Sequence, residues 1–597
     1  MNSLDLAPIG NCAISALIDR LGRVVWCCAP RVDSDPLFSQ LLSGAEPDDI
    51  DARGLWAIDL DGFASASQAY LRNTAVLRTE LHDVSGGSVE IIDFAPRFRL
   101  YDRGYRPASF VRLLRPLSGA PRIRIRLRPT CNLGSSAAPV TTGSNHIRYI
   151  CSDVTMRLTT NAPVSHIAEE RLFRLETPIA LFLGPDEPFQ GEVLSTANRM
   201  LGDTTDYWRE WVRVLAIPLD WQEAVIRAAI TLKLCAYEET GAIVAAITTS
   251  IPEAPNSGRN WDYRYCWIRD AYYVVQALNR LGAVDIMENY LGYLRNIMDL
   301  AAGGHIQPVY GVGYEPILTE RTAPALAGYR GMGPVRIGNQ AHEHVQHDVY
   351  GQIVLSTAHA FFDERLIRPA TLADFEALER QGERAFAVYD KPDAGLWELR
   401  TRQAVHTYSA AMCWAACDRL GNVAEKLGLT ERAAFWNGRA ATIRQAIEDC
   451  AFDAEAGHFR ATFSGKELDA SLTQLVDLRF LKADDPRNLA TLKALESQLR
   501  RGSNFLRYDV ADDFGVPETA FNFCTFWFIE ALHLTGQTAQ ARKLFEQMLE
   551  KRNHVGLLSE DVSFSDGSLW GNFPQTYSLV GLINCAVLLS RPWSSVR

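Results

Sequence analysis

The chain has 597 residues, of which 47% are hydrophobic and 22% charged, a composition typical of a folded globular protein but too long for one ordinary core. Its formal net charge of −11 argues against nucleic acid or an anionic membrane as the main partner. No stretch approaches the roughly 20 apolar residues that cross a bilayer, and the first residues lack the pattern of an export signal. The sequence therefore predicts a cytoplasmic protein of two or more domains.

Antiparallel β-structure is predicted for the first 200 residues. RIRIRLR (122–128) alternates arginine with Ile or Leu, which is the period of a strand with one wet face. SVEIIDF (88–94) follows a Ser-Gly-Gly turn, and residues 16–28 predict a hairpin with its turn near Gly22. Strands at this spacing are typical of a sandwich, which we expect to occupy residues 1–205.

The hydrophobic pattern becomes helical near residue 205. We expect a linker helix region over 206–220 and an all-α domain over 221–597. Val225, Ala228 and Leu232 begin its helical spacing. Several later segments are apolar on nearly all sides, so they should be buried on more than one side. Layered helices with their loops gathered at one end are the expected arrangement.

The twelve cysteines form no CxxC pair, and their spacing matches neither a zinc framework nor a disulfide scaffold. We therefore expect buried free thiols, no metal and no cofactor. HEHVQH (342–347) invites a zinc site, but His342 and His347 are five positions apart rather than the four of HExxH. His344 and His347 could still meet on one helical face, which keeps a metal site there as an alternative.

Two segments combine aromatic and charged side chains in a way that suits a binding pocket. NWDYRYCWIRD (260–270) places rings beside arginines and aspartates that need partners if buried. GLWELR (395–400) places Glu398 directly after Trp397. An indole in a poorly hydrated pocket would raise the pKa of that carboxyl, as a general acid requires. Each feature alone is more often structural.

Two further segments carry candidate residues. LLSEDVSFSDG (557–567) places Glu560 after an apolar pair and before a turn, where a carboxylate can face a cleft and stay ionised. GYRGMGPVRIGN (328–339) is a glycine-rich loop with Arg330 and Arg336, too irregular for a simple turn. It matches neither a phosphate-binding P-loop nor a dinucleotide-binding loop.

Three of these segments resemble, in chain order, the signature segments of glycoside hydrolase family 15, namely WDYRYCWIRDA, GLWELR and LLSEDVSFSDG, and the same resemblance covers GYRGMGPVRIGN. That family includes glucoamylases, glucodextranases and bacterial or archaeal trehalases. The resemblance extends to GAIVAAITTSIPE, HDVYGQ, GNFPQTYSLVGLI and the amino-terminal GNCAISALIDRLGRVVWCC, so it covers nearly the whole chain. It implies an N-terminal antiparallel β-sandwich followed by an all-α (α/α)6 toroid, as in the six-hairpin glycosidases.

The resemblance also implies roles for individual residues. Glu398 matches the family's general acid and Glu560 its general base, while Arg269 and Asp270 match the pair that holds the non-reducing glucose. We further expect substrate contacts from the neighbouring aromatic residues and from the glycine-rich loop, namely Trp267, Trp397, Tyr263, Arg330 and Arg336. Leu399 follows the acid where many relatives carry an aromatic or acidic residue, which leaves the specificity for the leaving group open.

The activity that follows is hydrolysis of an α-glucoside with inversion, releasing β-glucose from the non-reducing end. A glucoamylase-like action on maltose or short α-glucans is the first expectation, and hydrolysis of trehalose is the close alternative. A phosphorylase that uses phosphate in place of water, and a non-catalytic glucan-binding protein, are the more distant alternatives. The expected partner is a small oligosaccharide or disaccharide, with no nucleic acid and no membrane. Association into a homo-oligomer stays open.

Overall fold

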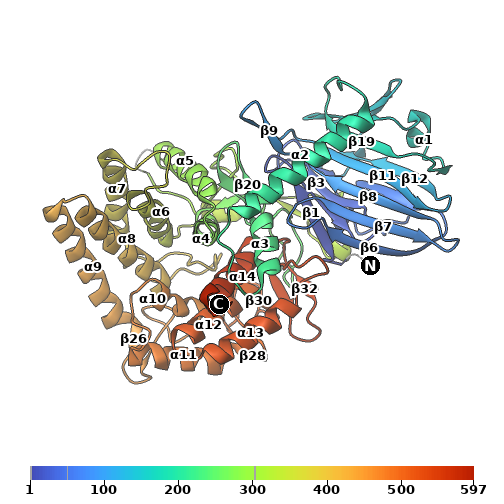
Figure 1. Cartoon of the computed structure of the whole chain (residues 1–597). Coiled ribbons are helices and arrows are strands. Elements are labelled where there is room, and N and C mark those ends of the chain that lie inside the picture. Colours follow the sequence, from blue (N-terminus) through green and yellow to red (C-terminus); the bar gives the residue numbers. More distant parts are fainter. Residues whose placement is uncertain (1–2, 50, 302–303, 597) are drawn as a thin grey trace.

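The structure, a computed structural model, describes residues 3–49, 51–301 and 304–596. An N-terminal β-sandwich, blue to cyan in Figure 1, is followed by a helical domain coloured green to red. Helix α2 (Val193–Arg213) runs across the sandwich towards the helical domain. The predicted fold class is confirmed.

Two antiparallel sheets form the sandwich. In the first, the strand order is β1 (Leu6–Gly10), β2 (Ser15–Asp19), β3 (Val24–Cys28), β5 (Leu55–Leu60), β12 (Arg122–Arg128) and β18 (Phe173–Arg174), with β4 (Pro36–Phe38) beside β3. In the second, the order is β15 (Val140–Thr142), β16 (His146–Ile150), β17 (Thr155–Thr160), β19 (Ile179–Pro185), β11 (Phe110–Ser118), β8 (Ser88–Phe94), β7 (Leu77–Asp83) and β6 (Phe63–Tyr70). Apolar side chains from both sheets meet in one core between them.

The alternation in RIRIRLR places one face of β12 in that core, as predicted. Ile123, Ile125 and Leu127 are buried. The opposite face is not uniformly wet, because Arg126 is also buried and its guanidinium donates two hydrogen bonds to Asp59 on the neighbouring β5, at 2.6 and 2.8 Å. The predicted hairpin is confirmed, since β2 pairs with β3.

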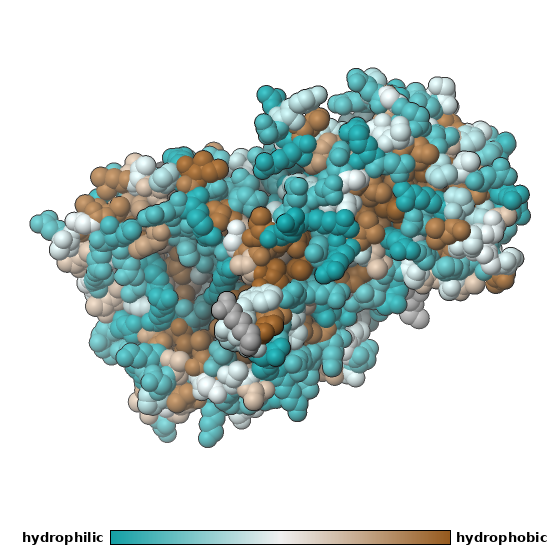
Figure 2. All heavy atoms as spheres, viewed as in Figure 1, coloured by the Kyte–Doolittle hydropathy of each residue, from teal (hydrophilic) through white to brown (hydrophobic). Residues whose placement is uncertain are grey.

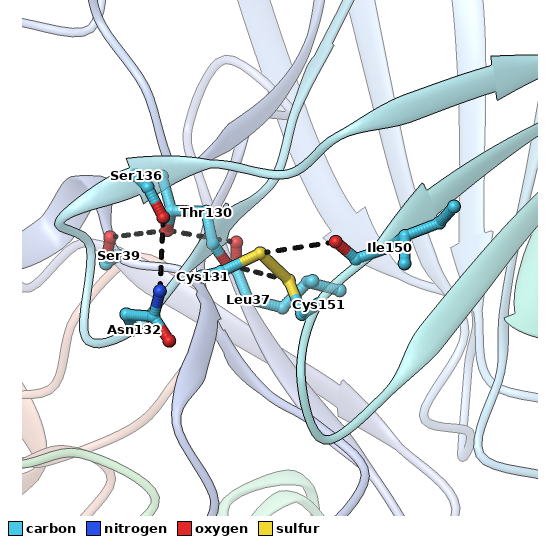
Figure 3. The surroundings of a disulfide bond; sticks show 8 residues. All are labelled: Leu37, Ser39, Thr130, Cys131, Asn132, Ser136, Ile150 and Cys151. Carbon is cyan, nitrogen blue, oxygen red and sulfur yellow. Dashed lines mark hydrogen bonds between the residues drawn. A yellow bond between two sulfur atoms is a disulfide. The ribbon is translucent and has the colours of Figure 1, made fainter.

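One pair of cysteines departs from the expectation of free thiols. Cys131, at the end of β13 (Thr130–Cys131), forms a disulfide with Cys151, just after β16, with a Cα–Cα distance of 5.5 Å (Figure 3). The bond joins segments that the sheet topology brings together and that sequence spacing did not reveal. The remaining ten cysteines are free, and all except Cys450 are buried.

Helices of the second domain form two concentric layers. The inner layer is α4 (Ile268–Arg280), α6 (Asp348–Ala358), α8 (Thr407–Lys426), α10 (Gln474–Asp477) with the preceding 3-10 turn Ala470–Thr473, α12 (Asn522–Leu534) and α14 (Thr576–Leu589). Neighbours in this order pack together, and α14 packs on α4 to close the ring. The outer layer is α3 (Gln222–Leu234), α5 (Val284–Leu300), α7 (Leu372–Val388), α9 (Thr430–Ala451), α11 (Pro486–Leu499) and α13 (Thr538–Glu550).

Burial follows the two layers because each helix hides only the faces that have neighbours. Every residue of α6 is buried, whereas α7 and α13 bury a single face each. The inner helices are therefore the segments that the sequence showed as apolar nearly all round.

Helix α2 packs against both domains, first in a hydrophobic cluster separate from the core between the two sheets and then in the core of the helical domain. Val193, Ala197 and Met200 in its first half pack against the second sheet, while Trp208 and Trp211 near its end belong to the core of the helical domain. The helix thus begins before residue 205, and the division at 205 and 221 stays a prediction. The face in Figure 2 is largely hydrophilic over both domains, with smaller hydrophobic patches. Within the described ranges, no helix combines the length and apolarity needed to cross a membrane.

Candidate active site

A pocket lies at the end of the toroid where the inner helices begin. Its wall is built from the segments that precede α4, α6, α8, α12 and α14, and from the first turns of α4 and α14. Seven of the predicted site residues line it, namely Glu398, Glu560, Arg269, Asp270, Trp267, Trp397 and Tyr263. The closed ring of helices is what brings these distant segments together.

Glu398 lies in the loop between α7 and α8. Its backbone φ is 59°, a left-handed conformation that is disfavoured for residues other than glycine and that is often found at functional sites. One carboxylate oxygen, Oε1, accepts a hydrogen bond from Trp267 Nε1 at 2.6 Å and another from Arg269 Nη2 at 3.2 Å. Both donors fix the carboxyl group in the pocket wall.

The indole beside this carboxyl is Trp267 rather than the preceding residue in sequence. Trp397 instead donates its Nε1 hydrogen to Asp469 Oδ2 at 3.0 Å, and its ring packs edge-on against Tyr508 with 5.9 Å between centroids. Trp397 still lines the pocket. The sequence placed Trp397 beside the acid in one pocket, and the structure adds that the hydrogen bond to the acid comes from Trp267.

Glu560 lies immediately before β31 (Asp561–Ser563) and is 2% exposed. Its Oε1 accepts a hydrogen bond from Tyr263 Oη at 2.6 Å, and Oε2 accepts one from the backbone N–H of Asn572 at 3.4 Å. Gly571 has a φ of 73°, and a Cβ there would lie 2.7 Å from Oε2. Only glycine fits this close approach.

The expectation that Glu560 stays ionised because it faces a cleft is contradicted. Burial raises the pKa of Glu560 well above its usual range, and the nearby carboxyls of Glu253 and Asp561 raise it further. The hydrogen bond from Tyr263 and the charge of Arg507 act in the opposite direction. Burial likewise raises the pKa of Asp561 to about 8. Because several carboxyl groups share a poorly hydrated site, their neutral forms are favoured.

Two aromatic rings connect the two glutamates. Tyr263, which binds Glu560, and Trp267, which binds Glu398, pack edge-on with 5.5 Å between their ring centroids. Trp267 belongs to β22 (Cys266–Trp267), which pairs with β23 (Val309–Tyr310). A single short segment therefore positions both carboxyls.

Arg269 and Asp270 follow in the first turn of α4. Arg269 donates to Tyr577 Oη at 2.8 Å and to Gln346 Oε1 at 3.0 Å, in addition to its bond with Glu398. Asp270 lies 3.8 Å from the arginine Nε, and its Oδ2 has no hydrogen-bond partner among the described residues. Burial raises the pKa of Asp270 to about 7, although the charge of Arg269 lowers it. An unsatisfied buried acceptor in a pocket wall suits a ligand hydroxyl.

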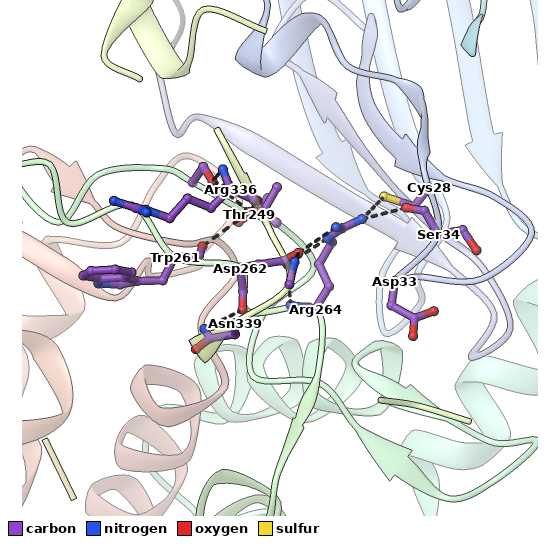
Figure 4. A network of polar contacts seen from close by, with 12 residues as sticks. Cys28, Asp33, Ser34, Thr249, Trp261, Asp262, Arg264, Arg336 and Asn339 are labelled. Carbon is purple, nitrogen blue, oxygen red and sulfur yellow. Dashed lines mark hydrogen bonds and ion pairs between the residues drawn. The ribbon is translucent and has the colours of Figure 1, made fainter. Parts of the chain in front are cut away.

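The other charged residues of the same segment, Asp262 and Arg264, do not line the pocket, and Figure 4 shows Arg264 extending towards Cys28 and Ser34. Arg264 forms a bidentate ion pair with Asp262, at 2.9 and 2.7 Å, and both side chains are fully buried. It also donates to the backbone carbonyl of Ser34 at 2.7 Å and to Cys28 Sγ at 3.2 Å, both in the sandwich domain. Asn339 donates to the carbonyl oxygen of Asp262 at 3.1 Å. This pair joins the two domains.

Neither arginine of the glycine-rich loop lines the pocket. Arg330 is exposed, and its guanidinium lies over the ring of Trp570, 5.3 Å from the centroid. Arg336 forms an ion pair with Glu320 at 2.8 Å and lies 5.4 Å from the ring centroid of Trp261, which does line the pocket. Asn339, at the end of the loop, lines the pocket, whereas the two arginines lie outside the lining.

Sequence reasoning missed several residues of the pocket. Glu253 accepts from Trp261 Nε1 at 2.9 Å and from Arg507, and both Glu253 and Arg507 line the pocket. The sequence around neither residue has a pattern that indicates a buried charge. Tyr577 lies in GNFPQTYSLVGLI, a segment of the family resemblance, and accepts a hydrogen bond from Arg269 that no local pattern indicates. The described part of the chain holds no group of three or more His, Cys, Asp or Glu residues suited to a metal ion.

Both domains match known protein families in sequence. The sequence profile of glycosyl hydrolases family 15 matches residues 220–587, and that of the trehalase-like N-terminal domain matches residues 5–176. The trehalase of Thermoplasma volcanium is 32% identical over 97% of this chain and 92% of its own length. The trehalase of Mycolicibacterium smegmatis is 31% identical over 98% and 91%, respectively.

A solved crystal structure has the same fold. A bacterial glucoamylase, crystallised with acarbose, superposes over 98% of this chain and 94% of its own, with a TM-score of 0.67 at 13% sequence identity. At that identity the likeness concerns the fold alone. The sequence profiles and the full-length relatives go further, and together with the pocket they show that this chain is a glycoside hydrolase belonging to glycosyl hydrolases family 15.

Proposed function

We propose that the chain hydrolyses the glycosidic bond of α,α-trehalose with inversion, using Glu398 as general acid and Glu560 as general base. The observation that carries the proposal is that both carboxyls line one pocket and are held by adjacent rings of one segment. An inverting glycosidase requires an acid and a base on opposite sides of the sugar, about 6.5–9.5 Å apart, so that a water molecule fits beside the base.

Glu398 would protonate the glycosidic oxygen as the bond from the anomeric carbon to that oxygen breaks. Two donors, Trp267 Nε1 and Arg269 Nη2, bind its Oε1 and stabilise negative charge on that oxygen. The described residues offer no hydrogen bond to Oε2, so the transferable proton belongs on Oε2. This arrangement presents an acid proton to the leaving group and stabilises the carboxylate that remains.

Glu560 would remove a proton from the attacking water, whose oxygen forms the new bond to the anomeric carbon. The hydroxyl of Tyr263 donates to Oε1 at 2.6 Å, whereas the bond from the Asn572 N–H to Oε2 is longer, at 3.4 Å, so Oε2 would receive the proton. At the end of the reaction Glu398 is ionised and Glu560 is neutral, and exchange with solvent restores both. The raised pKa of Glu560 makes it a stronger base, provided that the pH ionises it.

Asp270 and Arg269 would hold the glucose that is attacked. Asp270 has an unpaired carboxylate oxygen in the pocket, and a sugar hydroxyl is the donor that it lacks. The three hydrogen bonds of Arg269 hold its guanidinium in place, so it positions Glu398 and Tyr577 around that glucose. A fixed geometry of this kind is what lowers a barrier by orientation.

Trehalose is favoured over the maltose first expected from the sequence. The relatives that span both domains are named trehalase, and the sandwich matches the trehalase-like N-terminal domain. The likeness to a glucoamylase does not bear on substrate, because it reflects the fold. A cytoplasmic location stays a prediction from the sequence.

The test is a comparison of trehalose, maltose and isomaltose, with the products followed by proton NMR in the first minutes. Inversion of trehalose should give β-glucose and α-glucose in equal amounts, since only the attacked sugar changes configuration. Two α-glucose molecules per turnover would contradict inversion, and faster turnover of maltose than of trehalose would contradict the substrate. Formation of glucose 1-phosphate only when phosphate is added would favour a phosphorylase.

A further inference from the structure

One histidine of the HEHVQH segment lies in the pocket, although the proposed chemistry does not use it. His344 follows the 3-10 turn Gln340–Glu343 and precedes α6. It lines the pocket, and its backbone N–H donates to the carbonyl of Ala341 at 3.0 Å. Neither ring nitrogen has a hydrogen-bond partner among the described residues, and both are shielded from solvent. A half-buried ring whose two shielded nitrogens have no partner needs an explanation.

Backbone contacts show which part of the pocket wall this ring belongs to. The residue after His344, Val345, accepts a hydrogen bond from the backbone N–H of Ala394 at 2.9 Å, in the loop that carries Glu398. Arg269 binds both Gln346 and Glu398. The segment of His344 therefore packs against the loop of the acid. Because Glu398 faces the glycosidic oxygen, this is the side on which the leaving sugar sits.

The charged residues Arg400 and Asp513, which also line the pocket, already have partners. Arg400 forms an ion pair with Glu320 at 2.9 Å, and its guanidinium stacks on Trp261, 4.4 Å from the ring centroid. Asp513 accepts the backbone N–H of Arg400 at 2.6 Å. Of the groups around the acid, the imidazole of His344 is thus the one with both a donor and an acceptor position unused by the described residues.

The ionisation state of His344 suits a sugar. Burial lowers the pKa of its ring, so the imidazole is neutral at neutral pH. A neutral imidazole offers one N–H donor and one acceptor nitrogen, and a sugar hydroxyl offers the same two functions. Leu399, which follows the acid, offers neither. His344 would supply the polar contact that Leu399 lacks.

We infer that His344 is a specificity-determining residue that hydrogen-bonds the hydroxyls of the leaving glucose. The inference rests on the proposed function, because it takes trehalose as the substrate and Glu398 as the acid. His344 would then discriminate between a glucose leaving group and leaving groups that have no hydroxyls.

The test compares trehalose with α-glucosyl fluoride, whose leaving group is a fluoride ion. His344→Leu should lower kcat/KM on trehalose about 10–100-fold, the effect of removing one or two hydrogen bonds to a substrate. The same variant should hydrolyse α-glucosyl fluoride within about threefold of the wild type. His344→Asn, which keeps a donor and an acceptor, should recover part of the activity on trehalose.

His347→Leu is the matched control. Both ring nitrogens of His347 are also buried without a described partner, but His347 does not line the pocket. This variant should change the two substrates by the same factor. Equal losses on both substrates for His344→Leu, or no loss on either, would overturn the inference. A wild-type protein that hydrolyses neither substrate would instead overturn the proposed function.

Discussion

Two sets of side chains in the segment 260–270 have different functions. Asp262 and Arg264 are fully buried, paired with each other and bound to the sandwich, whereas Tyr263 and Trp267 face the pocket and hold the two glutamates. In an extended chain, successive side chains point to opposite faces, so neighbours can serve unrelated purposes. A dense mixture of rings and charges therefore need not belong to one site.

The comparison also gives the sandwich a structural role. Burying the ion pair costs desolvation free energy, which is offset only if every donor and acceptor of the pair has a partner. The backbone carbonyl of Ser34 in the sandwich is the acceptor that completes the hydrogen bonds of Arg264. With the charged side fixed in this way, the aromatic side is held in place against the carboxyls. The predictions below separate these two functions, beginning with the largest expected effect.

Removal of the base should abolish most of the activity. Glu560→Gln is expected to lower kcat on trehalose about 10³–10⁴-fold, because the amide cannot take a proton from water. Circular dichroism should be unchanged, since glutamine keeps the acceptor for Tyr263. Asp186→Asn, at an exposed ion pair of the sandwich, is the control that should stay fully active. A kcat within tenfold of the wild type would exclude Glu560 as the base.

Breaking the ion pair should mainly affect stability. Arg264→Met leaves the carboxylate of Asp262 buried without its partner, which should lower the free energy of unfolding by about 3–5 kcal/mol, measured by urea titration with tryptophan fluorescence. The double variant Asp262→Asn with Arg264→Met removes both charges and should recover part of this loss. A single variant as stable as the wild type would show that the pair does not hold the domains together.

Loss of the tyrosine hydroxyl should have a smaller effect, confined to catalysis. Tyr263→Phe removes the hydrogen bond to Glu560 Oε1 and should lower kcat about tenfold, the scale of one hydrogen bond to a charged group. Its thermal midpoint should stay close to that of the wild type, in contrast to Arg264→Met. If the two variants lost stability equally, the two faces of the segment would not be separable.

The pH dependence of kcat/KM should test the effect of the pocket-facing side of this segment on Glu560. A carboxyl with a raised pKa is ionised only at higher pH, so kcat/KM should fall as the pH is lowered through the pKa of Glu560. The pKa of Asp270, about 7, acts in the same direction. We expect the midpoint of this limb to lie above the roughly 4.3 of an ordinary glutamate. In Tyr263→Phe the midpoint should move upward, because the lost hydroxyl stabilised the ionised form; a midpoint that moves downward would contradict this.

Much of the fold was readable from the sequence because it depends on periodicity. The alternation of β12, the turn of the first hairpin and the nearly all-apolar inner helices each reflect a local pattern of burial. The segments that contain both glutamates were also recognisable, since each joins unusual residue types within a few positions. These features need no knowledge of what lies across the molecule.

Contacts between distant segments were decided only by the tertiary structure. Trp397 precedes Glu398 in sequence and lines the same pocket, yet the ring closure makes Trp267 the indole that donates to Glu398. The tertiary structure also places Arg330 and Arg336 outside the pocket lining, pairs Cys131 with Cys151, and surrounds Glu560 with carboxyls that raise its pKa. Periodicity records which face of a segment is buried, whereas partners and electrostatics depend on which other segments meet that face.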